Sequence, residues 1–81
     1  METQIGKVIK FFPKINVAII EPSQEIKIGD KIIIRGSGNI EMTIKSMQIN
    51  HKEVESATET FGLKIPEIAK EGDLVFKIEE D

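Results

Sequence analysis

Lysines and phenylalanines near the N-terminus are spaced in a way that suits binding. Lys7, Lys10 and Lys14 flank the Phe11-Phe12-Pro13 segment. Lysine ammonium groups can hold phosphates, and aromatic faces can stack on bases. The same pattern also suits an ordinary strand, in which Phe fills the core and alternating lysines protect an exposed edge. If folding brings distant lysines to the same surface, the predicted binding patch comprises Lys7, Lys10, Phe12, Lys14, Lys45 and Lys52.

His51 is the only histidine, and the chain has no cysteine. A metal site generally needs three or four converging ligands, and Glu53 and Glu55 are the candidates to assist His51. A general base would also need an orienting partner and a nucleophile. We therefore interpret His51 as an exposed loop residue and expect neither a metal site nor a catalytic residue.

The other chemical signals in the sequence are weak. Acid and base catalysis requires carboxyl groups with separated pKa values in a pocket, whereas Glu53, Glu55 and Glu59 are typical of a solvated loop. The chain lacks a phosphate-binding G-x-x-x-x-G-K-[ST] string, and Gly36-Ser37-Gly38 is typical of a turn. We predict no cofactor, no bound nucleotide and no enzymatic activity.

Charge and composition limit the functional classes further. Eleven basic and fourteen acidic side chains give a net charge of −3, which argues against general affinity for nucleic-acid backbones but leaves room for a local basic patch. The absence of cysteine excludes disulfides and is compatible with a reducing compartment. The N-terminus lacks the features of a signal peptide, and the apolar runs are short. We expect a cytoplasmic protein without a membrane partner.

The elements that must position these residues are predicted to be strands. A length of 81 residues suits a single domain, which we place over residues 1–81. Gly and Pro divide the chain into short pieces rich in β-branched residues, which predicts an all-β fold. The segment 50–60 is interpreted as a loop, with a capped helical turn as the alternative. The six predicted strands lie at about 5–12, 16–21, 31–35, 40–49, 61–65 and 74–78.

Two glycine-aspartate turns and one irregularity shape this pattern. Lys27-Ile28-Gly29-Asp30 and Glu71-Gly72-Asp73 each precede an apolar strand, and glycine can adopt the positive φ that such turns require. The alternation of apolar residues slips near Lys45-Ser46, which predicts a β-bulge that would help a barrel to close. In segment 31–35, Ile33 should point away from the core unless the whole strand is buried.

Three segments together resemble the barrel shared by translation factors: Glu25–Ile32, Thr43–Gln48 and Glu71–Val75. This resemblance implies a small closed six-stranded Greek-key barrel like domain 2 of translation GTPases, without the GTPase. Four other segments are more similar to the stand-alone translation elongation factor-like barrel: Ile5–Val8, Phe12–Ile15, Ser46–Ile49 and His51-Lys52. They are also similar to the C-terminal barrel of collagenase-like peptidases, several of which are implicated in RNA hydroxylation.

The chain departs from that family pattern at one loop. The fifth strand of such barrels usually follows a Gly-Asp or Gly-Glu turn, whereas Ala57 is followed here by Thr58-Glu59-Thr60. The resemblance therefore implies least about the function of this loop.

Two functions follow as expectations. The resemblance implies a non-catalytic module associated with translation, in contact with RNA or a ribonucleoprotein. The alternative is a protein-interaction or accessory domain that acts in trans with a peptidase-like or RNA-modifying enzyme. The acidic balance of the chain suits the alternative better, and sequence reasoning leaves both open.

Overall fold

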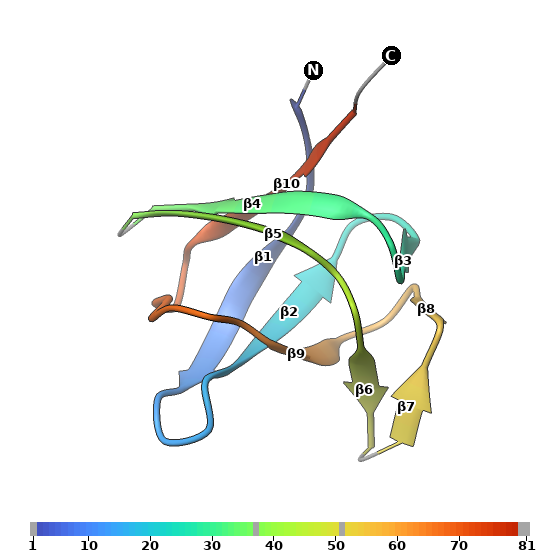
Figure 1. The fold of residues 1–81 in the computed structure, drawn as a ribbon, viewed down its shortest axis with the longest axis horizontal. Coiled ribbons are helices and arrows are strands. Elements are labelled where there is room, and N and C mark those ends of the chain that lie inside the picture. The colour runs from blue at the N-terminus through green and yellow to red at the C-terminus, as the bar shows by residue number, and fades with distance from the viewer. Residues whose placement is uncertain (1, 37, 51, 80–81) are drawn as a thin grey trace.

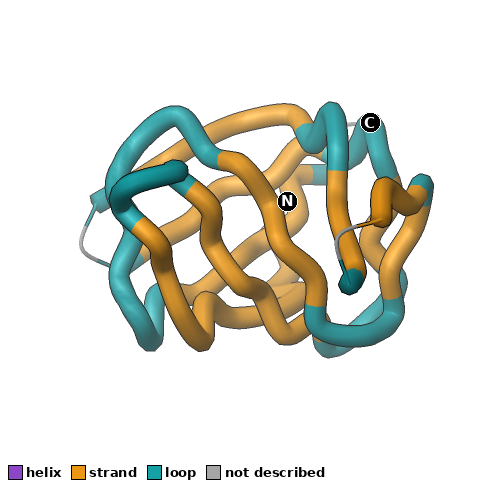
Figure 2. Tube along the Cα trace, turned by 90° about the horizontal axis from the view of Figure 1, so that it is seen from below, coloured by secondary structure: helices purple, strands orange, loops and turns teal. Residues whose placement is uncertain are grey.

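The computed structural model describes residues 2–36, 38–50 and 52–79, and every regular element in these ranges is a β-strand (Figure 2). The all-β prediction is therefore confirmed. The strands are β1 (Glu2–Phe12), β2 (Val17–Pro22), β3 (Ile26–Lys27), β4 (Lys31–Arg35), β5 (Asn39–Thr43), β6 (Met47–Ile49), β7 (Lys52–Val54), β8 (Ser56–Ala57), β9 (Phe61–Lys64) and β10 (Leu74–Ile78).

The main sheet is antiparallel and has the order β5-β4-β10-β1-β2-β9-β6-β7, and β3 pairs with β8 in a second small sheet. The main sheet curls around the core as an open half-barrel (Figure 1). The predicted closed six-stranded barrel is wrong, because in the described residues β5 pairs only with β4, and β7 pairs only with β6. The translation-factor-like Greek key is likewise not confirmed.

The departures from the predicted strands have local causes. The predicted strand 40–49 is divided at Ile44-Lys45-Ser46, so the slip in alternation marks a bend between β5 and β6 and not a bulge. The segment interpreted as a loop contains β7 and β8. The short strands β3 and β8 were missed because each depends on pairing with a distant partner, Ile26 opposite Ala57 and Lys27 opposite Ser56.

The concave face of the sheet holds a single core made largely of isoleucine. Ile33 lies on the opposite face, as expected from alternation, but its neighbours Glu41 and Phe76 on adjacent strands leave it only 7% exposed. Burial of apolar surface is the main favourable contribution to folding in a domain of this size. The core comprises Ile5, Val8, Ala18, Ile20, Ile26, Ile32, Ile34, Ile40, Ile44, Met47, Ala57, Phe61, Leu63, Ile65, Ala69 and Val75.

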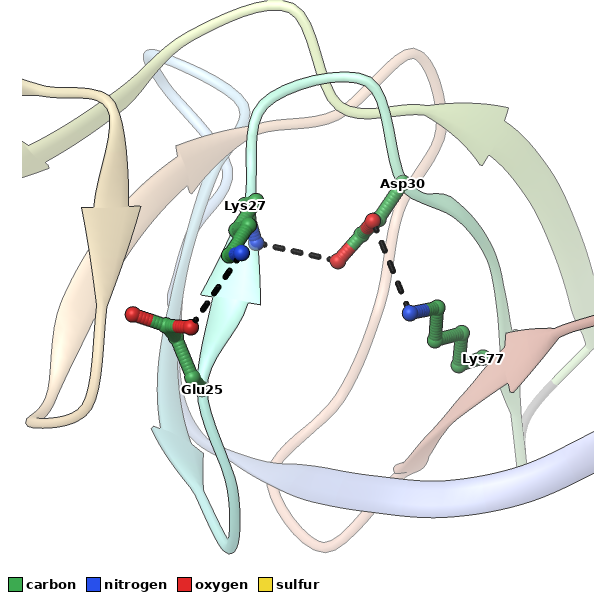
Figure 3. Close-up of polar contacts among 4 residues, drawn as sticks. All are labelled: Glu25, Lys27, Asp30 and Lys77. Atoms are coloured by element: carbon green, nitrogen blue, oxygen red, sulfur yellow. Dashed lines mark hydrogen bonds and ion pairs between the residues drawn. The ribbon is translucent and has the colours of Figure 1, made fainter.

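Both glycine-aspartate turns have the same geometry. Asp30 N–H donates to Lys27 C=O at 3.1 Å, and Lys27 N–H donates back to Asp30 Oδ2 at 2.9 Å. Gly29 adopts φ 97°, the conformation that glycine favours at the third position of a type II turn. Figure 3 shows this turn with two ion pairs, Lys27 to Glu25 at 3.5 Å and Asp30 to Lys77 at 3.7 Å.

The second turn repeats these bonds in a more buried setting. Asp73 N–H donates to Lys70 C=O at 3.1 Å, and Lys70 N–H donates to Asp73 Oδ2 at 3.0 Å. Gly72 has φ 92°. Asp73 is only 6% exposed, so its carboxylate has little access to water and depends on hydrogen bonds within the protein.

Each turn is bonded to a point where a strand changes direction. Gly29 N–H donates to Ile44 C=O at 2.8 Å, and Ile44 N–H donates to Asp30 C=O at 2.9 Å. In the second turn, Gly72 N–H donates to Val8 C=O at 2.8 Å, and Val8 N–H donates to the backbone C=O of Asp73 at 2.7 Å. Val8 precedes a bulge in β1, where the pairing with β2 shifts register. The turns therefore hold both the β5–β6 bend and the β1 bulge.

Replacing the two turn aspartates should have unequal effects. Asp73→Ala should lower the free energy of unfolding by about 1–3 kcal/mol, because it removes a hydrogen-bond acceptor from a poorly hydrated turn. Asp30→Ala should cost less, roughly 1 kcal/mol or below, because water reaches the half-buried Asp30 more easily than Asp73 and the Lys77 ion pair is weak. Urea unfolding of both variants would measure the difference, and equal losses would contradict the role assigned to Asp73.

A third glycine is required because the chain passes close to Asp73. A Cβ added to Gly36 would overlap Asp73 Oδ1, and Gly36 has φ 155°. Gly38 lies two residues further on, and a Cβ there would meet no atom within 4 Å.

Gly36→Ala should therefore destabilise the domain by about 1–3 kcal/mol, since the new methyl group must displace a buried carboxylate. Gly38→Ala is the matched control and should change stability by less than about 0.5 kcal/mol. Thermal unfolding of the two variants would check this contrast. A tolerated alanine at residue 36 would show that the close approach to Asp73 is not needed for folding.

Candidate interaction surface

The predicted patch is partly assembled by the first hairpin. Lys7, Lys10 and Phe12 lie on β1, and Lys14 lies in the turn that leads to β2. The bulge at Ile9 keeps Lys7 and Lys10 on the same outer face, because their partners on β2 are Glu21 and Ile19. Lys10 Nζ lies 5.1 Å from the centre of the Phe12 ring, within the range of a cation–π contact.

Lys45 and Lys52 lie on other elements. Lys45 is in the β5–β6 bend, where it lines a separate pocket with Lys64 and Met42. Lys52 is on the edge strand β7, opposite Ile49 of β6. The six predicted residues therefore do not form one basic patch, and Lys7 itself has the carboxylate of Glu21 as its cross-strand neighbour.

An apolar groove lies beside the hairpin, on the outer face of the sheet. Its walls come from β1, β2, β6 and β9 and from the hairpin turn. Directly paired residues on neighbouring strands point to the same face. One row across this face runs from Lys10 through Ile19 and Gly62 to Gln48, and the next includes Phe12, Val17 and Lys64. The groove is lined by Phe12, Ile15, Val17, Ile19, Gln48, Ile49, Asn50, Thr60, Phe61 and Gly62.

Phe12 was predicted from the sequence as a binding residue, but the other residues that line this groove were not. The apolar run Val17–Ile20 was a visible signal, since a half-buried strand should alternate and this one is apolar on both faces. Ala18 and Ile20 fill the core, which leaves Val17 and Ile19 for the outer face. The groove also needs the pairing of β2 with β9, and that pairing is not visible in the sequence.

The groove is suited to contact rather than to chemistry. Phe12 is 38% exposed and Ile15 is 60% exposed, although both are large apolar side chains. No ionisable side chain lines the groove. Clustered exposed apolar side chains often mark a surface that another molecule covers.

The other candidate groups do not form a site in the part of the chain that is described. Across residues 2–36, 38–50 and 52–79, no three His, Cys, Asp or Glu side chains gather as they would around a metal ion. Glu53, Glu55 and Glu59 are exposed, and His51 lies outside the described residues. Within the same ranges we find no helix long and apolar enough to cross a membrane.

The segment Thr58-Glu59-Thr60, which differs from the family pattern, is exposed and connects β8 to β9. Its last residue, Thr60, lines the groove, as Asn50 does. This loop therefore borders the candidate surface.

Comparison with known proteins relates the chain to peptidases. No protein-family model matches it. An uncharacterized protease of Methanocaldococcus jannaschii is 46% identical over 81 residues, an alignment that covers 95% of this chain and 20% of that protein. The chain thus spans about a fifth of the length of this relative.

Two crystal structures share the fold. One is the C-terminal domain of a Geobacillus thermoleovorans protein described as a U32 peptidase, with a TM-score of 0.86 and 16% identity over 94% of this chain and 92% of that domain. Its selenomethionine variant gives a TM-score of 0.84 and 15% identity, covering 90% of this chain and 96% of that one. These comparisons support the expected likeness to a peptidase C-terminal barrel and do not support the likeness to translation factors. The chain has the fold of a U32 peptidase C-terminal domain.

Proposed function

We propose that this protein is a non-catalytic accessory domain that binds a peptidase-like enzyme through the groove beside the first hairpin. The observation that carries the proposal is the sequence match to a segment of a much longer protease from M. jannaschii. A segment that forms a fifth of a larger protein commonly packs on the remainder through an interface. An equivalent domain can make the same kind of contact in trans.

The surface of the domain supports a protein partner over RNA. The formal charge is −3, and the predicted lysines are divided among the hairpin, the β5–β6 bend and β7. RNA binding depends on a contiguous basic surface. Protein interfaces instead combine an apolar centre with polar groups, and the groove is lined by apolar side chains together with the uncharged Gln48, Asn50 and Thr60.

Ile15→Ser should weaken the complex with a peptidase-like protein encoded by the same genome. Ile15 is 60% exposed and lines the groove, so the substitution removes apolar contact area at little cost to folding. We expect affinity to fall about tenfold, as for truncation of a central interface side chain. Isothermal titration with the two purified, nuclease-treated proteins would measure this change.

Ile68→Ser provides the matched control. Ile68 is 67% exposed and does not line the groove, so this variant should bind within about twofold of the original chain. The absence of any complex at micromolar concentrations would contradict the proposed function. Association that requires RNA and disappears after nuclease treatment would restore the ribonucleoprotein hypothesis.

A further inference from the structure

Gly62 leaves a hollow in the outer face of the sheet. It is the cross-strand partner of both Ile19 and Gln48, so it stands in the middle of a row of side chains. A Cβ added to Gly62 would lie 3.5 Å from Val17 Cγ1, 3.7 Å from Ile19 Cδ1 and 3.8 Å from Gln48 O. These are ordinary van der Waals distances, so a side chain would fit at residue 62, and its absence leaves room above the glycine for an apolar group of another molecule.

The surroundings of this hollow are apolar on several sides. Val17 and Ile19 border it, and Phe12 and Ile15 extend the wall toward the hairpin turn. The groove has a volume of about 380 Å³, which lies near the lower end of the range for sites that take small organic groups. This shape suits one bulky side chain, such as leucine or phenylalanine, better than an extended flat surface.

Charged side chains flank the hollow at both ends of its row, with Lys10 on β1 and Glu53 on β7. Lys10 flanks Ile19 in the row that contains Gly62, and Lys64 flanks Val17 in the next row. In the described residues, the ion pairs engage other lysines and leave Lys10 and Lys64 without a carboxylate partner. No acidic residue lines the groove, and Glu53 lies opposite Gln48 at the other end of the row from Lys10. The hairpin end of the groove therefore complements an apolar group that has a negative charge beside it.

We propose that Gly62 forms the floor of a socket that receives one bulky apolar side chain of a protein partner. Lys10 and Lys64 hold a carboxylate of the partner next to that side chain. This inference rests on the proposed accessory function and specifies the chemistry of the partner's contact.

A small probe with the same chemistry tests the socket without any partner protein. Phenylpropanoate joins a phenyl ring to a carboxylate, and phenylpropylammonium is the matched control with the opposite charge. Titration of the ¹⁵N-labelled full chain with phenylpropanoate should shift the amide signals of Gly62, Ile19 and Lys64. The amides of Gly29 and Gly72, on the two distant turns, should not move. The ammonium probe should bind about twofold to fivefold more weakly, which is within the range expected for an exposed ion pair.

Filling the hollow should abolish binding while the fold is retained. Gly62 does not have a positive φ, and glycine within a strand is generally less favourable than a β-branched residue. Gly62→Val should therefore melt at the original temperature or above and bind phenylpropanoate at least tenfold more weakly, since the valine occupies the space for the probe. Gly62→Ala adds a single methyl group and gives an intermediate test if valine disturbs the sheet.

Several results would overturn the socket. Scattered shifts, unchanged binding by Gly62→Val, or equal affinity for the two probes would each contradict it. Stronger, salt-dependent binding of an oligouridylate at the same amides would assign the groove to nucleic acid instead. Replacing Lys10 and Lys64 together by Glu should reverse the preference between the two probes, and an unchanged preference would remove these lysines from the proposal.

The socket and the accessory function can fail separately. A peptidase complex that is insensitive to Gly62→Val would overturn the socket and leave the accessory function standing. A chain that binds phenylpropanoate at Gly62 but no peptidase-like protein would have the socket without the proposed function.

Discussion

Two glycine-aspartate turns determine how this sheet bends. Each turn is closed by the aspartate at its end, and each exchanges backbone hydrogen bonds with an irregular point on another strand. Gly29 and Asp30 hold Ile44 where β5 turns into β6, and Gly72 and Asp73 hold Val8 beside the bulge in β1. Because a strand that bends must give up regular ladder bonds, these turns supply partners for the backbone groups that would otherwise be left unpaired.

The bends allow a small chain to enclose one core and leave a second apolar surface outside. Ala18 and Ile20 of β2 fill the concave side, whereas Val17 and Ile19 lie on the convex side beside Gly62. The hairpin turn lies at the opposite end of the molecule from the paired ends of β1 and β10 (Figure 1). In a domain with this arrangement, a linkage to another domain at the paired ends of β1 and β10 would leave the hairpin face open to a partner.

The parts of the fold that local sequence determines were predictable. Strands such as β4 and β10 are bounded by turns with clear glycine-aspartate signals, so their limits follow from residues close by. The short strands β3 and β8 could not be found, because Ile26 and Ala57 become strand residues only when the chain brings them together. Closure of the barrel was inferred from the resemblance, and whether two edges of a sheet meet depends on the curvature of the whole sheet.

In the candidate surface too, local features were predictable from the sequence and features that depend on long-range strand pairing were not. Lys10 and Phe12 were identified as part of a cluster of lysines and phenylalanines in the first hairpin, and their contact is local. Val17 and Ile19 were visible as apolar residues, but only the pairing of β2 with β9 places them around Gly62. Gly62 contributes to this surface because it has no side chain and leaves a hollow between its neighbours. No sequence pattern predicts such a hollow.

The most direct test of the account is a methyl NMR footprint of the complex with a peptidase-like partner, using isoleucine and valine labels in this chain. The signals of Ile15, Val17 and Ile19 should shift or broaden on binding, while those of Ile28 and Ile68 should stay unchanged. All five side chains are at least partly exposed, so each can report a contact. A footprint centred on Ile28 or Ile68, with the hairpin face unaffected, would contradict it.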